Sequence, residues 1–95
     1  MFRILLVDDE PLVLEVTKLS LEKMSGFHVT GLLDAKRALE VLKTTRFDAI
    51  VSDYNMPGMD GLAFLAALRK EGHTTPFIIF TGKGREEIAV EAYEL

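Results

Sequence analysis

The sequence predicts an α/β fold, a parallel sheet with helices on both of its faces. Short apolar segments alternate with segments of helical periodicity, in the order strand then helix, repeated four times. Strands that alternate with helices pair in parallel through right-handed crossovers. The strand segments are mostly apolar throughout rather than at every second residue, which is typical of strands buried on both faces.

Four apolar segments are predicted to be the strands of this sheet. They cover residues 2–7, 27–32, 47–52 and 76–81. The first, third and fourth are strongly apolar, and the second lies beside Gly26 and includes Gly31. All four have the length of ordinary strands, and helical patterns separate them.

Helical spacing and capping residues define the first two helices. The first covers residues 11–24 and has Pro11 in its first turn, a position that proline favours. Its apolar residues at helical spacing are Leu12, Val16 and Leu19. The second helix follows Asp34, a preferred N-cap residue, and extends to Lys43.

Two further helices follow the third and fourth strands. A loop marked by Pro57, Gly58 and Gly61 precedes the third helix, and Asp60 is expected to cap it. The apolar residues of this helix include Leu62, Leu65 and Leu68. The last helix is predicted to start near Arg85. The apolar residues on one of its faces are Ile88, Ala92 and Leu95.

The end of the chain lacks a stop signal, because neither a C-cap glycine nor a later helix breaker follows the last helix. The strand at 76–81 would then lie at a sheet edge, where Phe77 to Phe80 carry no protecting charge. We therefore expect that a further strand and helix of the domain are missing from this chain. We also expect the exposed edge 76–81 to promote a homodimer.

Size and composition limit the class of protein. The chain has 95 residues, of which 48% are hydrophobic, and this supports one domain over residues 1–95. A formal net charge of −4 gives no electrostatic footprint for nucleic acid or for an anionic membrane. Cysteine, a signal peptide and a membrane-spanning apolar stretch are all absent from the sequence. We expect a cytoplasmic protein that contacts neither nucleic acid nor membrane directly.

Oxygen-bearing side chains lie at the ends of three predicted strands. Asp8 and Asp9 follow the first strand, Asp53 follows the third, and Thr81 ends the fourth. Because the carboxyl ends of parallel strands form one rim of the sheet, where ligands of such folds bind, we expect these residues to converge.

Three carboxylates at one place raise one another's pKa unless a cation is present. Mg²⁺ suits such a site, because it takes one or two carboxylates, keeps several waters and bridges to phosphate oxygens. No cluster of His or Cys favours zinc. A metal beside an aspartate suggests phosphoryl transfer, with Asp53 as the nucleophile that forms an acyl phosphate and Thr81 as a hydrogen-bond donor.

Each of these residues also has a structural alternative. Asp8 and Asp9 precede Pro11 and could cap the first helix. Asp53 could be a turn aspartate in the stretch before the loop, and Thr81 could satisfy a backbone group at a strand end. Their joint placement at matching strand ends favours a site.

The segments LLVDDEP, IVSDYNMPGMDGL and FIIFTG resemble the signature of response-regulator receiver domains, over essentially the whole chain. The resemblance implies a flavodoxin-like, doubly wound parallel sheet of order 2-1-3-4-5, of which this chain lacks the fifth strand and the last helix. It also implies phosphorelay signal transduction, with a sensor histidine kinase as donor and an output domain or protein as downstream partner. Self-phosphorylation and slow autodephosphorylation would be its only catalytic activities.

The resemblance also implies a role for each site residue. Asp53 is similar to the phosphoacceptor of the family. Asp8 and Asp9 are similar to its Mg²⁺-binding acidic pair, which acts together with Asp53 and the backbone carbonyl of Asn55. Thr81 resembles the switch hydroxyl that turns toward the phosphoryl group.

Two features of the family are absent from this chain, namely the fifth-strand lysine that contacts the phosphoryl group and the aromatic switch residue. Lys83 is not that lysine, because it lies only two residues after Thr81. The alternative function is therefore a non-switching pseudo-receiver that only binds partners. A phosphatase-type enzyme is a third reading, but such enzymes usually place a second aspartate where this chain has Asn55.

Overall fold

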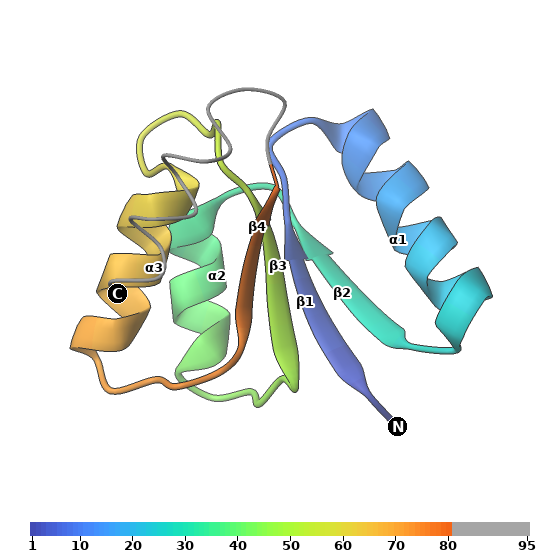
Figure 1. The fold of residues 1–95 in the computed structure, drawn as a ribbon. Coiled ribbons are helices and arrows are strands. Elements are labelled where there is room, and N and C mark those ends of the chain that lie inside the picture. Colours follow the sequence, from blue (N-terminus) through green and yellow to red (C-terminus); the bar gives the residue numbers. More distant parts are fainter. Residues whose placement is uncertain (81–95) are drawn as a thin grey trace.

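The computed structural model describes residues 1–80, which form one four-stranded parallel sheet flanked by three helices (Figure 1). The order of the strands across the sheet is β2-β1-β3-β4. Their bounds are Arg3–Val7 for β1, His28–Leu32 for β2, Ala49–Asp53 for β3 and Phe77–Phe80 for β4. The predicted α/β class and the order 2-1-3-4 are confirmed.

The sheet register aligns the carboxyl ends of the two central strands. Val7, the last residue of β1, pairs with Leu32 of β2 on one side and with Ser52 of β3 on the other. Asp53, one residue further along β3, pairs with Phe80 at the end of β4. Residues that follow Val7 therefore emerge next to Asp53, at the point where the strand order reverses.

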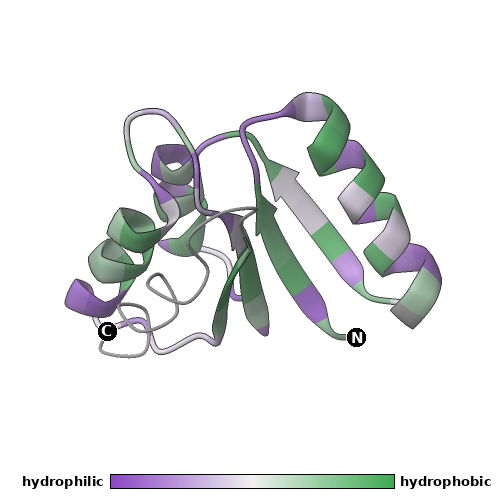
Figure 2. Ribbon diagram, turned by 45° about the horizontal axis from the view of Figure 1, so that its top comes forward, coloured by the Kyte–Doolittle hydropathy of each residue, from purple (hydrophilic) through white to green (hydrophobic). Residues whose placement is uncertain are grey.

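The three helices cover the two faces of the sheet unequally. Helix α1 (Pro11–Ser25) lies on one face, and α2 (Ala35–Leu42) and α3 (Gly61–Lys70) lie together on the other (Figure 1). Alternate residues of β1 supply both cores, because successive side chains of a strand point to opposite faces. Leu5 and Val7 join the core beneath α2 and α3, whereas Ile4 and Leu6 join the one beneath α1. The central strands are accordingly hydrophobic along most of their length (Figure 2).

The helices begin at the residues that the sequence predicts. Pro11 is in the first turn of α1. Asp34 Oδ1 accepts a hydrogen bond from Arg37 N at 2.7 Å, and Asp60 Oδ1 accepts one from Ala63 N at 2.8 Å. Each carboxylate satisfies an amide that has no partner within its helix, so the predicted caps of α2 and α3 are confirmed.

The apolar row that predicts α1 does not pack on the sheet. The helix is present, but Leu12, Val16 and Leu19 are 76%, 55% and 52% exposed. The side chains that reach the core are Leu14 and Leu21, which lie two turns apart on another face. Because α1 has apolar residues on more than one face, their spacing predicts a helix without indicating which face is buried.

Strand β3 differs from its prediction at both ends. Strand β3 covers 49–53 rather than 47–52, so Asp53 is its last residue and not the first residue of the loop. The reason lies at its start, where Phe47 and Asp48 belong to the preceding connection and the Asp48 carboxylate accepts a hydrogen bond from Arg3 N at 2.7 Å.

Within residues 1–80, no helix is long and apolar enough to cross a membrane. Thr81 and the predicted last helix lie outside the described residues.

Candidate functional site

Three carboxylates meet at the carboxyl edge of the sheet. Asp8 and Asp9 follow β1, Asp53 ends β3, and one carboxylate oxygen from each lies within 4.8 Å of the others. Asp8 is buried, with 2% of its surface exposed, whereas Asp9 and Asp53 are half-buried. The predicted convergence of these three residues, named here the acidic cluster, is present.

Asp8 is held by the backbone on both sides. Its amide continues the β1–β2 ladder by donating to Leu32 O at 3.1 Å, and its Oδ1 accepts from Glu10 N at 2.9 Å. Glu10 is the N-cap residue of α1, and no side chain makes the capping hydrogen bond there. The Asp8 carboxylate thus bonds the amide of the N-cap residue itself, and not a free amide of the first helical turn as a capping side chain would. A buried carboxylate with one amide partner retains oxygen atoms for another ligand.

The chain after Asp53 is fixed by contacts that the sequence does not reveal. Tyr54 N donates to Phe80 O at 3.1 Å, and Gly61 N donates to Tyr54 O at 2.9 Å. A Cβ at Gly61 would lie 2.7 Å from the carbonyl oxygen of Asp53, so only glycine fits there without a shift of the backbone. The start of α3 thus packs directly on the peptide that follows Asp53.

Ser52 adds a second support beneath the acidic cluster. It is fully buried, and its hydroxyl donates to Asp53 O at 2.9 Å. Neither Ser52 nor Gly61 is predicted as a functional residue from the sequence. A serine that follows three apolar residues of its strand, and a glycine directly after an N-cap aspartate, are the only signals of their roles.

The electrostatics of the site disfavour the ionised form of Asp53. Burial raises the pKa of the Asp53 carboxyl most, followed by the nearby negative charge of Asp8 and, to a smaller extent, that of Asp9. Hydrogen bonding to the backbone N–H groups of Asn55 and Tyr54 lowers the pKa in opposition, but the net shift is upward. A cation placed among these carboxylates would remove the repulsion.

The donor set fits a hard divalent cation. The acidic cluster offers three carboxylate oxygens, close together and partly shielded from solvent, and carboxylate oxygen is the ligand that Mg²⁺, Mn²⁺ and Ca²⁺ prefer. The chain has no cysteine, and no histidine belongs to the acidic cluster. Asn55 lies in the exposed loop after β3, and its backbone carbonyl as a ligand stays a prediction.

The family to which this fold and this site belong is clear from comparison with known proteins. The model of the response regulator receiver domain matches residues 4–95. The chain belongs to this family, as the sequence motifs predict, and it is a receiver domain of the two-component type. Receiver domains of response regulators are not classical enzymes.

Several proteins of similar sequence are transcriptional regulatory proteins. It is 36% identical over 93 residues to the transcriptional regulatory protein QseB of Escherichia coli O157:H7, covering 98% of this chain and 42% of that protein. It is 35% identical over 92 residues to PrrA of Mycobacterium tuberculosis, covering 97% of this chain and 39% of that protein. The chain thus spans less than half the length of these relatives.

Solved structures agree on the fold. The receiver domain of the Francisella response regulator 1452 superposes with a TM-score of 0.90 at 32% identity, covering 99% of this chain and 77% of that one. Full-length FixJ from B. japonicum superposes with a TM-score of 0.87 at 33% identity, and the match covers 98% of this chain and 45% of the FixJ chain. The flavodoxin-like receiver fold is therefore confirmed.

Proposed function

We propose that this chain accepts a phosphoryl group on Asp53 from a sensor histidine kinase, in a reaction that needs Mg²⁺. The observation that carries this proposal is the acidic cluster, in which Asp53 ends β3 at the switch point with oxygens of Asp8 and Asp9 within 4.8 Å. Residues 1–95 act as one receiver domain, and membership of the receiver family supports this assignment.

The chemistry follows from the protonation state of Asp53. An ionised carboxylate oxygen attacks the phosphorus of a phosphohistidine, the P–N bond breaks, and the leaving imidazole takes up a proton. Ionisation is hindered by the raised pKa of Asp53, because burial and the Asp8 carboxylate both oppose it. Asp8, Asp9 and Asp53, with the backbone carbonyl of Asn55, would hold Mg²⁺. When bound, this ion neutralises charge on the carboxylates and on the phosphoryl oxygens.

Phosphorylation would change the charge at the end of β3. A phosphoryl group carries about −1.5 to −2 charges and strong acceptor oxygens. The Thr81 hydroxyl, in its proposed role as the switch residue, donates to one of those oxygens. The new contacts bias a local two-state element and so change the affinity for an output domain or a downstream protein. The transcriptional regulators among the relatives support an output domain as partner, and a cytoplasmic location fits that pathway.

Intact mass spectrometry with acetyl phosphate tests the proposal. The chain should gain the mass of one phosphoryl group when MgCl₂ is present, and no adduct should form with EDTA. Asp53→Asn should abolish the adduct. Asp34→Asn is the matched control, because asparagine caps a helix as well as aspartate and Asp34 lies at the start of α2. An adduct of equal yield in Asp53→Asn would contradict the assignment.

The same experiment distinguishes the pseudo-receiver alternative. A pseudo-receiver would take up neither acetyl phosphate nor beryllofluoride, although it keeps the fold. The intact acidic cluster favours the switching domain over this alternative. A phosphatase would turn over phosphate esters continuously instead of stopping at a single adduct. Asn55, two residues after the nucleophile, argues against that chemistry.

A homodimer through strand 76–81 is a separate proposal. Among the described residues β4 is an edge strand, and Ile78 on it is 56% exposed. An edge strand without charged residues is a template for pairing with a second copy. Light scattering should therefore give a mass that increases with concentration toward twice that of the monomer. A monomer at every concentration would exclude this interface.

A further inference from the structure

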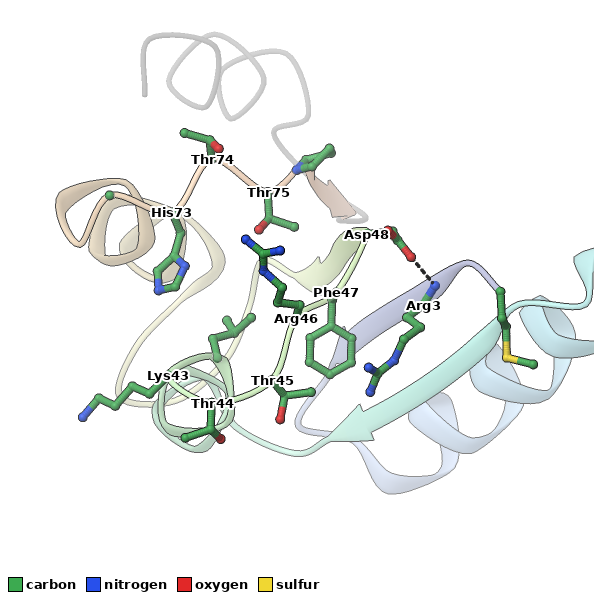
Figure 3. A pocket seen from close by; sticks show the side chains of 14 residues that line it. Arg3, Lys43, Thr44, Thr45, Arg46, Phe47, Asp48, His73, Thr74 and Thr75 are labelled. Atoms are coloured by element: carbon green, nitrogen blue, oxygen red, sulfur yellow. Dashed lines mark hydrogen bonds between the residues drawn. The ribbon is translucent and has the colours of Figure 1, made fainter.

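A groove of about 840 Å³ lies at the amino-terminal edge of the sheet (Figure 3). It is formed by the start of β1, the α2–β3 connection and the α3–β4 connection. The acidic cluster lies at the carboxyl edge, a strand length of roughly 15 Å away. We call this surface the basic groove. The proposed phosphorylation of Asp53 makes no use of it.

The basic groove is cationic in a chain of net charge −4. It is lined by Arg3, Lys43 and Arg46 together with His73. Among the described residues that line it, Asp48 is the only acid. The Asp48 carboxylate accepts a hydrogen bond from the backbone N–H of Arg3 at 2.7 Å, so part of its acceptor capacity is already used. The local field therefore favours an anion.

Some cations at this edge have structural partners. Lys43 Nζ lies 3.2 Å from Glu40 Oε1. A cation at the carboxyl end of a helix also interacts favourably with the negative end of the helix dipole. Arg46 differs from these residues, because it lies in the connection after α2 and belongs to no helix. Within residues 1–80, its guanidinium makes no salt bridge. Its side chain points toward the loop that carries His73 and Thr75 (Figure 3).

The walls of the basic groove are fixed before any ligand binds. Arg69 Nη1 donates to the carbonyl oxygens of both His73 and Thr75 at 3.0 Å, which holds the α3–β4 connection in place. On the opposite wall, Arg3 Cζ lies 5.3 Å from the centre of the buried Phe47 ring, a cation–π contact that orients the guanidinium. Preformed walls reduce the entropy lost on binding.

We propose that the basic groove binds a small organic phosphate, with Arg46 as its main anchor. The volume of the groove lies within the range of small-molecule sites. The planar guanidinium of Arg46 matches two phosphate oxygens at once. His73, Thr45 and Thr75 also line the groove, and their side chains carry further hydrogen-bond donors.

An NMR titration of the 95-residue chain with phenyl phosphate tests this site. EDTA in the buffer keeps metal out of the acidic cluster, so that the cluster repels phosphate. The amide chemical shifts of residues 44–46 and 73–75 are expected to change with phenyl phosphate concentration and to reach a plateau. Affinity should fall about tenfold or more in Arg46→Gln, which loses a bidentate charged contact. It should stay unchanged in Lys23→Gln, which removes an exposed cation from α1 on the other face of the sheet.

Competition and salt define the class of ligand. Phenyl phosphate should bind more tightly than succinate, and NaCl should weaken its binding because the contacts are exposed to solvent. Absence of saturable shifts, or equal affinity in Arg46→Gln and the parent chain, would overturn the site. Tighter binding of succinate would overturn the assignment of an organic phosphate. None of these results depends on whether Asp53 is phosphorylated.

Discussion

Replacing Gly61 with alanine is expected to displace the backbone that carries the proposed phosphoacceptor. A Cβ at position 61 would lie 2.7 Å from the carbonyl oxygen of Asp53 and 3.0 Å from the Cα of Tyr54. A carbon–oxygen contact is normally about 3.3 Å or longer, so one of the two backbones must move by roughly 0.6 Å. Both contacts fall on the peptide that links the end of β3 to the following loop.

The expected effects on stability and on rate differ in size. Inserting a methyl group into a packed region costs about 1–3 kcal/mol, and alanine recovers about 0.4–1 kcal/mol by restricting the unfolded chain. We therefore expect the free energy of unfolding to fall by about 1–2 kcal/mol. Misplacement of a reacting group by about 1 Å can lower the reaction rate about 100-fold. The rate of phosphorylation by acetyl phosphate should accordingly fall about tenfold or more.

Gly72→Ala is the matched control for this variant. Gly72 has a φ of 86°, and a Cβ there would meet no atom within 4 Å. Alanine in this left-handed conformation costs about 1–2 kcal/mol, a loss of stability similar to that in Gly61→Ala. Gly72 lies at the opposite edge of the sheet, so the rate should not change. Urea unfolding measures the free energy of unfolding, and timed intact-mass spectra measure the rate of phosphorylation by acetyl phosphate. Equal phosphorylation rates in Gly61→Ala and the parent chain, or an equal loss of phosphorylation rate in Gly61→Ala and Gly72→Ala, would refute the reasoning.

Three further predictions concern charge, metal and packing. Burial and Asp8 raise the pKa of Asp53, so without metal the contribution of this carboxyl to the free energy of unfolding is greatest when it is protonated and is lost as pH rises through the raised pKa. In EDTA, Asp53→Asn should therefore be more stable than the parent chain, by a margin that grows as pH rises above 3.8 in urea unfolding; a margin independent of pH would contradict this. MgCl₂ at about 100 times its Kd should stabilise the parent chain by about 2.7 kcal/mol in thermal unfolding, whereas an unchanged Tm would count against the metal site. Leu14→Ala should lower the free energy of unfolding by about 2 kcal/mol, because Leu14 packs on the core beneath α1. Leu12→Ala, at an exposed position, should cost about 0.5 kcal/mol or less in the same urea assay, and similar costs would contradict the observed orientation of α1.

Much of the fold could be predicted because it depends on local signals. Asp34 and Asp60 cap their helices as predicted, since a carboxylate at an N-cap satisfies an amide within its own turn. The meeting of Asp8, Asp9 and Asp53 follows from strand order alone, because parallel strands end at one rim. These inferences need the sequence pattern and the topology, and no detail of packing.

The remaining features depend on contacts between distant parts of the chain. Which face of α1 is buried is decided by the sheet, so the exposed position of Leu12 could not be predicted from spacing. The close approach of Gly61 to Asp53 O exists only once α3 has packed on the end of β3. The basic groove joins Arg3, Arg46 and His73 from three separate segments, none of which forms a motif.

The central claim is that Asp53 itself receives the phosphoryl group, and peptide mapping tests it most directly. The chain would be treated with acetyl phosphate and MgCl₂ and reduced with borohydride, which converts an acyl phosphate to homoserine. It would then be digested with trypsin and sequenced by mass spectrometry. The peptide of residues 47–69 contains Asp48, Asp53 and Asp60, so its fragments separate the candidates. Homoserine at position 53 is the predicted result. Homoserine at position 48 or 60, or in the peptide that carries Asp8 and Asp9, would contradict the account.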